Sequence, residues 1–193
     1  MPLGTVCWTS GSSEVAVLSV VLPYDADWPE WFEAEAALLR QALRPWLVAI
    51  EHVGSTAIPG MPAKPVIDMV AGVGDLEEAR AATTPLQALD YHYRPHRPEA
   101  LCYHKPALEE WRRHTHHLHL TTVGSDLWVE RLTFRDALRA DRELARKYAA
   151  WKLGHAVLED SEGGPYDASK WTFVAHVLAS KSVPLKPDVE RLA

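Results

Sequence analysis

Short apolar runs, several of them rich in β-branched residues, alternate along the first two thirds of the chain with polar segments and with segments containing Pro or Gly. Runs of this length are typical of buried strands, because an amphipathic helix needs a longer segment with apolar positions three and four residues apart. The pattern predicts strands at residues 15–21, 46–53, 65–73, 100–104 and 115–123.

Helical spacing of apolar positions predicts the remaining elements. A first helix begins at Asp27, which is placed to cap it, has Pro29 in its first turn and ends near Arg44. Asp75 and Glu78 are three residues apart and form a capping box for a helix of about two turns. Three further helices are predicted at residues 125–139, 141–158 and 166–181. The order of elements predicts an α+β fold with a mixed sheet, covered largely on one side by helices, and a helical C-terminal part.

The length of 193 residues is that of one ordinary domain with a real core. Residues 1–14 are small and polar and are predicted to form a flexible extension. A single domain is expected over residues 15–185, followed by a tail over residues 186–193.

The overall charge argues against a nucleic-acid partner. Acids and bases are mixed along the chain and sum to a net charge of −6, which leaves no basic surface for a polyanion.

Only Cys7 and Cys102 are present, so neither a disulfide framework nor a cysteine zinc site is expected. No apolar stretch approaches the roughly 20 residues that span a bilayer, and the start lacks the features of a signal peptide. We therefore expect a cytoplasmic protein that acts on a small molecule, with no membrane partner; whether a protein partner exists is left open.

The segment IEHVGSTAIPGMPAKPVIDMVAGV, residues 50–73, carries the first candidate chemistry. Gly54, Ser55 and Thr56 form a turn whose N–H and hydroxyl groups could face a phosphate, and Asp68 on the following strand could hold a divalent metal against it. Lys64 is the cation of this loop and could neutralise a phosphate or a carboxylate, although a solvated loop lysine is an equal alternative.

Two-metal chemistry needs converging carboxylates, and position 70, the partner of Asp68 on the same strand face, is Val. His117 and His119 share one strand face, and His52 precedes the Gly-Ser turn. Together with Asp68 they predict a metal site of imidazole and carboxylate. Such a set suits Zn²⁺ or Mn²⁺ better than Mg²⁺. The alternative is that the histidines only donate hydrogen bonds or touch substrate phosphate directly.

Four segments carry a family resemblance: VVLPYDADWPEWF, IEHVGSTAIPGMPAKPVID, THHLHL and WVERLTFRDALRADRELARKYAAWK. In this order they resemble the GrpB family over about residues 20–180. The resemblance implies a nucleotidyltransferase-like fold of the polymerase-beta type with part of the acidic site missing. It also places basic residues on the helices, of which Arg135 and Lys170 lie beside aromatic residues and are the preferred partners of a nucleotide.

Three functions follow from these residues. The first is transfer of a nucleotidyl group, adenylyl above all, from ATP or another NTP to a small acceptor. In it Gly54 and Ser55 hold the triphosphate, and Asp68 with His117 and His119 forms the catalytic metal site with Mg²⁺ or Mn²⁺. The second is a metal-dependent hydrolase or ligase in which the histidines bind a transition metal such as Zn²⁺. The third is a non-catalytic module that binds a nucleotide or a protein, because GrpB-like domains also occur appended to dephospho-coenzyme A kinase.

Overall fold

The computed structural model describes residues 21–94, 97–106, 114–155 and 165–184. The predicted extension at residues 1–14, the tail at 186–193 and all but the last residue of the predicted strand at 15–21 lie outside this range. None of the described helices combines the length and the apolar character that crossing a bilayer requires.

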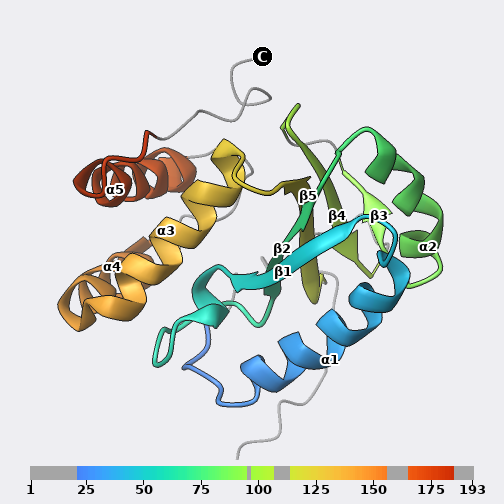
Figure 1. Cartoon of the computed structure of the whole chain (residues 1–193). Helices are drawn as coiled ribbons and strands as arrows, with labels where there is room; N and C mark the ends of the chain where they lie inside the picture. The colour runs from blue at the N-terminus through green and yellow to red at the C-terminus, as the bar shows by residue number, and fades with distance from the viewer. Residues whose placement is uncertain (1–20, 95–96, 107–113, 156–164, 185–193) are drawn as a thin grey trace, which may run out of the picture.

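The centre of the fold is a five-stranded mixed sheet in the order β1-β2-β5-β4-β3 (Figure 1). β2 and β5 run parallel, and the other neighbouring strands are antiparallel. The α+β class with a mixed sheet is therefore confirmed. The strands are β1 (Leu47–Val53), β2 (Ile67–Val73), β3 (His92–Tyr93), β4 (Ala100–Lys105) and β5 (His116–Thr122).

One face of the sheet packs against α1 (Trp28–Ala42) and α2 (Thr83–Gln87) and forms the main core. The buried side of α1 supplies Trp28, Phe32 and Leu39, and the strands supply alternate residues such as Met69 and Leu118. Successive side chains of a strand point to opposite faces, and in β5 the buried Leu118 and Leu120 alternate with the less buried His117 and His119. The opposite side chains of both strands are consequently turned to the other face.

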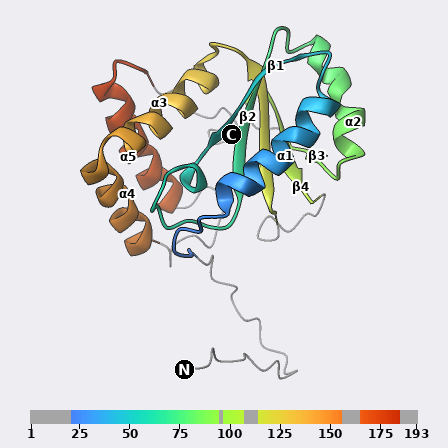
Figure 2. The same ribbon diagram turned by 60° about the horizontal axis from the view of Figure 1, so that its bottom comes forward.

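That other face is also covered by helices, so the prediction of a sheet covered largely on one side was wrong. Figure 2 shows α1 and α2 on one side of the sheet and the C-terminal helices on the other. α3 approaches the sheet so closely at Gly72 that a Cβ there would lie 2.8 Å from the Trp128 ring. The C-terminal helices are α3 (Asp126–Ala140), α4 (Arg142–His155) and α5 (Pro165–Ser180).

Helix starts match the predicted caps in part. The Asp75 carboxylate accepts hydrogen bonds from the backbone of Glu77 (2.7 Å) and Glu78 (3.0 Å). The segment that follows is a 3-10 helix, η2 (Glu78–Ala82), running into the short α2. Asp27 stands at the N-cap of α1 but makes no side-chain capping bond there, and its backbone is helical (φ −84°, ψ −12°) rather than extended as in a typical N-cap. Its N–H donates to the Asp25 carboxylate (2.9 Å).

Candidate metal centre

Asp68 and His117 meet where the two parallel strands of the sheet lie side by side. They are direct partners in the pairing of β2 with β5, and His117 Nδ1 lies 3.0 Å from Asp68 Oδ1. A carboxylate only accepts, so Nδ1 of His117 carries a proton, and in the neutral ring Nε2 keeps its lone pair. This is how a carboxylate orients a metal-binding imidazole.

Three imidazoles gather at this point. His104 is the partner of His117 in the pairing of β4 with β5, and His114 lies two residues before β5. The ring centroid of His104 lies 4.3 Å from that of His117 and 4.6 Å from that of His114. One nitrogen from each of the three rings lies within 4.8 Å of the other two. His104 Nδ1 and His117 Nε2 are buried and have no hydrogen-bond partner among the described residues. We call His104, His114 and His117 the imidazole cluster.

The protonation states favour ligation of a cation. Burial, followed by the charges of His117, His114 and Arg94, lowers the pKa of His104 to about 3, so this ring is neutral at neutral pH. Burial acts to raise the pKa of the Asp68 carboxyl, but the hydrogen bond and charge of His117 outweigh it. With further help from Arg131, the pKa of Asp68 stays well below its usual range, and the carboxylate is ionised.

The edge of the cluster reaches solvent, since the side chains of Asp68 and His117 are 34% and 27% exposed. Gly54 passes directly over the Asp68 carboxylate: a Cβ at Gly54 would overlap Asp68 Oδ2, and the residue has φ +72°. The close approach and the positive φ both require glycine. The turn and Asp68 are thus brought together, as the sequence predicted.

The chain matches the model of the GrpB protein family over residues 19–180. It belongs to the GrpB family. The family recognised from the sequence is therefore confirmed, together with the nucleotidyltransferase-like fold class.

Several members of the GrpB family are similar to this chain over most of its length. A UPF0157 protein of Pseudomonas aeruginosa, PA4798, is 35% identical over 161 residues, which are 82% of this chain and 65% of that protein. The UPF0157 protein YqkA of Bacillus subtilis is 33% identical over 68% of this chain and 38% of its own length. The chain thus spans less than two thirds of each of these two relatives. The crystal structure of the conserved protein GrpB from Enterococcus faecalis superposes with a TM-score of 0.72 at 26% identity, covering 84% of this chain and 99% of that one.

His52 does not join the candidate metal centre of this GrpB protein, contrary to the prediction. It pairs with Met69 across β1 and β2, so it points to the face covered by α1, where its ring stacks on Phe32 at 4.8 Å. Thr56 Oγ1 donates to the Val66 carbonyl (3.1 Å) and accepts from His52 Nε2 (3.0 Å). The Thr56 hydroxyl, predicted to face a phosphate, is therefore buried and used within the fold.

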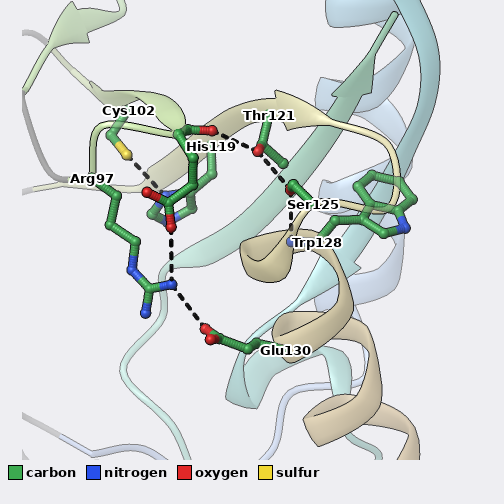
Figure 3. Close-up of polar contacts among 8 residues, drawn as sticks. Arg97, Cys102, His119, Thr121, Ser125, Trp128 and Glu130 are labelled. Carbon is green, nitrogen blue, oxygen red and sulfur yellow. Dashed lines mark hydrogen bonds and ion pairs between the residues drawn. The ribbon is translucent and has the colours of Figure 1, made fainter. Parts of the chain in front are cut away.

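His119 lies on the correct face but in a different environment. Its Nδ1 is 3.1 Å from Cys102 Sγ, and it is not one of the three imidazoles of the cluster. Figure 3 shows this pair close to the buried Arg97–Glu130 ion pair between the strands and α3. The geometry thus gathers Asp68 and His117 of the predicted set and leaves His119 beside Cys102.

Of the three predicted cations, Arg135 holds the fold together beside the site. Arg135 on α3 donates to Glu51 (2.6 Å) and to the His52 carbonyl (3.0 Å), so it clamps β1 rather than facing the cluster. Lys64 and Lys170 are half-buried, and their predicted roles toward a nucleotide stay predictions.

Further basic side chains hold the loop that follows β1. Lys152 on α4 donates to Ser55 Oγ (2.8 Å) and to the Pro62 carbonyl (2.9 Å). Arg139 on α3 donates to the Ala57 carbonyl (2.9 Å). The loop is thereby tied to both helices.

Sequence reasoning missed two of the three imidazoles and one arginine. His114 belongs to a run in which residues 114, 116, 117 and 119 are all histidine, and such a tract is itself a signal for metal binding. His104 ends the predicted strand at residues 100–104 and had no local signal, because its place opposite His117 depends on strand register. Arg131 was not distinguished from the other helical cations.

Proposed function

We propose that this GrpB protein is a metal-dependent enzyme whose divalent ion is bound by His104, His114 and His117, with Asp68 holding His117 in place. The observation that carries the proposal is the gathering of three imidazoles in which His104 Nδ1 and His117 Nε2 are buried without a hydrogen-bond partner among the described residues. Burying such groups without a partner costs about 1–3 kcal/mol each, and a bound cation removes that penalty.

The donor set decides the class of ion. Imidazole ligands suit Zn²⁺, Mn²⁺, Fe²⁺ or Ni²⁺, whereas Mg²⁺ prefers oxygen ligands. A metal held by three protein ligands keeps a position for water or a substrate oxygen, which it polarises as a Lewis acid. The chemistry supported best is hydrolysis, the second of the functions considered from the sequence.

Each residue has a distinct part in this proposal. Asp68 fixes the tautomer and the orientation of His117 and raises the basicity of its Nε2. Gly54 keeps the chain above Asp68 and limits how far the carboxylate can turn.

Nucleotidyl transfer is the second candidate. It is supported by the family's fold and by the Gly54-Ser55 turn lying over an ionised Asp68. Against it stand Val70, which is fully buried where a second carboxylate is needed, and the engagement of Asp68 Oδ1 by His117.

Calorimetric titration of metal-free protein with Zn²⁺, Mn²⁺ and Mg²⁺ tests the proposal. We expect Zn²⁺ or Mn²⁺ to bind at one site, and His104→Ala and His117→Ala each to weaken binding by more than about 100-fold. Asp68→Asn should weaken it about 10- to 100-fold, as is typical of a group that supports a ligand. His119→Ala and His176→Ala, the latter at an exposed position of α5, serve as controls and should bind normally.

Binding of ATP and hydrolysis of model esters by the same variants separate the two candidates. ATP binding that requires Mg²⁺ and Asp68 but is unaffected by His104→Ala would favour nucleotidyl transfer and overturn the hydrolase proposal. Hydrolysis of model esters that requires Zn²⁺ or Mn²⁺ and is lost in His104→Ala and His117→Ala would support the hydrolase.

A further inference from the structure

A serine and a buried lysine meet at the turn that follows β1. Lys152 of α4 is only 7% exposed, and its Nζ lies 2.8 Å from Ser55 Oγ. The Pro62 carbonyl accepts a second hydrogen bond from the same Nζ (2.9 Å), and the centroid of the Tyr148 ring lies 5.8 Å from it. The carbonyl and the ring therefore hold the amine of Lys152 against the Ser55 hydroxyl.

The backbone presents Ser55 in the way that a nucleophilic serine requires. After β1, Gly54 makes a sharp turn with φ +72° and ψ −171°, and Ser55 then opens a short 3-10 helix, η1 (Ser55–Ala57). A sharp turn from a strand into a helix is the arrangement that presents the nucleophilic serine of other hydrolases. Ser55 is half-buried, whereas the adjacent Thr56 is buried and hydrogen-bonded to His52. Of these two neighbouring hydroxyl residues, Ser55 is the one that keeps surface in solvent.

The contact between the two side chains suits general base catalysis. A serine becomes a nucleophile when a base within about 3 Å takes its proton. Loss of hydration disfavours the charged form of a buried lysine, which is why such lysines serve as bases. In the ammonium form, Nζ of Lys152 donates to both Ser55 and Pro62. A neutral amine keeps two hydrogens and one lone pair, so it can still donate to Pro62 while it accepts from Ser55 at the same distances.

We propose that Ser55 and Lys152 form a nucleophile and base pair that acts on an ester or amide of a carboxylic acid. Serine and lysine perform this chemistry together in other proteins. Nζ of Lys152 takes the Ser55 hydroxyl proton as Oγ forms a bond to the carbonyl carbon. The ammonium then protonates the leaving alcohol or amine as its bond to that carbon breaks, which leaves an acyl-enzyme.

Hydrolysis of the acyl-enzyme completes the cycle. Lys152 takes a proton from water as the water oxygen attacks the acyl carbon. The bond to Ser55 Oγ then breaks, Oγ regains a proton from the ammonium, and the carboxylic acid is released. These steps use only the two side chains, the substrate and water. The activity therefore goes beyond the proposed metal-dependent function and does not require a metal.

The test is the reaction of the metal-free full chain with p-nitrophenyl acetate. We expect a burst of p-nitrophenolate and one acetyl group per chain, located on Ser55 by peptide mass spectrometry and absent from Ser55→Ala. Lys152→Arg keeps a donor for Ser55 and Pro62 but is not a base, so acetylation of Ser55 should slow by about 100-fold or more. Lys147→Met, at an exposed position of the same helix, is the matched control and should react as the wild type does.

The pH dependence gives a second readout that a merely structural contact would not produce. Acetylation of Ser55 in the wild type should speed up with pH as the Lys152 ammonium loses its proton, and Lys152→Arg should lack this rise. Thermal unfolding shows whether each variant is folded. A wild type that gains no acetyl group on Ser55 overturns the proposal, as does acetylation at the wild-type rate in folded Lys152→Arg. If Lys152→Arg does not fold, a wild-type rate that is independent of pH overturns it.

A Zn²⁺ titration of the same protein keeps this outcome separate from that of the metal centre. Protein that binds Zn²⁺ but is not acetylated on Ser55 refutes only the serine and lysine pair. Protein that is acetylated on Ser55 but does not bind Zn²⁺ refutes only the metal-dependent function.

Discussion

Replacing Gly54 with Ala should damage both the turn and the Asp68–His117 pair. At Gly54 φ is +72° and ψ is −171°, a conformation that is essentially restricted to glycine. An added Cβ would overlap Asp68 Oδ2 and lie 2.9 Å from Asp68 Cβ and Cγ. The carboxylate would have to move, and its hydrogen bond with His117 would be lost.

The expected size of the effect follows from these two parts. The backbone strain costs about 1–3 kcal/mol. Loss of a hydrogen bond to a charged group costs about 1.5–3 kcal/mol, and because Asp68 is one-third exposed we take the lower end. Gly54→Ala should therefore reduce the free energy of unfolding by about 3–4 kcal/mol, which lowers Tm by about 10 °C for a chain of this size.

Gly60→Ala is a matched control for the backbone alone. Gly60 also has a positive φ, +77°, but nothing lies within 4 Å of an added Cβ. It should cost only the about 1–2 kcal/mol of a left-handed residue. Urea unfolding of the metal-free proteins gives both values. If the two substitutions cost the same, the contact between Gly54 and Asp68 does not constrain the carboxylate and the reasoning is wrong.

Two further predictions concern buried polar groups. Burial lowers the pKa of His52 from 6.5 to about 4, so the unfolded chain binds the proton first and stability is lost as pH falls from about 6.5 toward 4. Between pH 7.5 and 4.5, urea unfolding of His52→Gln should show about 2–3 kcal/mol less loss than the wild type, and equal losses would contradict this. Arg97→Met leaves Glu130 buried without its 2.9 Å partner and should cost about 3–5 kcal/mol. Adding Glu130→Gln should recover part of that loss, and strictly additive costs in the double-mutant cycle would refute the coupling.

Local pattern was sufficient to predict most of the elements. The alternation of His117, Leu118, His119 and Leu120 predicted a strand with a polar and an apolar face, and both faces are observed. β3 was missed because two residues are too few to show a period. The position of the C-terminal helices on the second face depends on long-range contacts, such as that between Gly72 and Trp128, which no local pattern contains.

The candidate site was predictable only as far as strand register could be guessed. His52 was expected to lie on the face of Asp68. In the observed register Glu51 pairs with Val70 and His52 with Met69, which reverses the two faces of β1. A shift of one residue turns every side chain of a strand to the other face, and register is set by contacts between strands.

The basic side chains that hold the loop after β1 have a consequence for how the molecule opens. Arg139 and Lys152 donate to Ala57, Ser55 and Pro62, and Ile58 and Met61 of the loop pack with Leu138 and Tyr148 of the two helices. Segments joined in this way form one cooperative unit in native-state hydrogen exchange. The backbone amides of the loop should therefore share the opening free energy of α3 and α4, although about 80 residues of sequence separate them. Local fluctuations that expose the candidate metal centre would then originate in the C-terminal half of the chain.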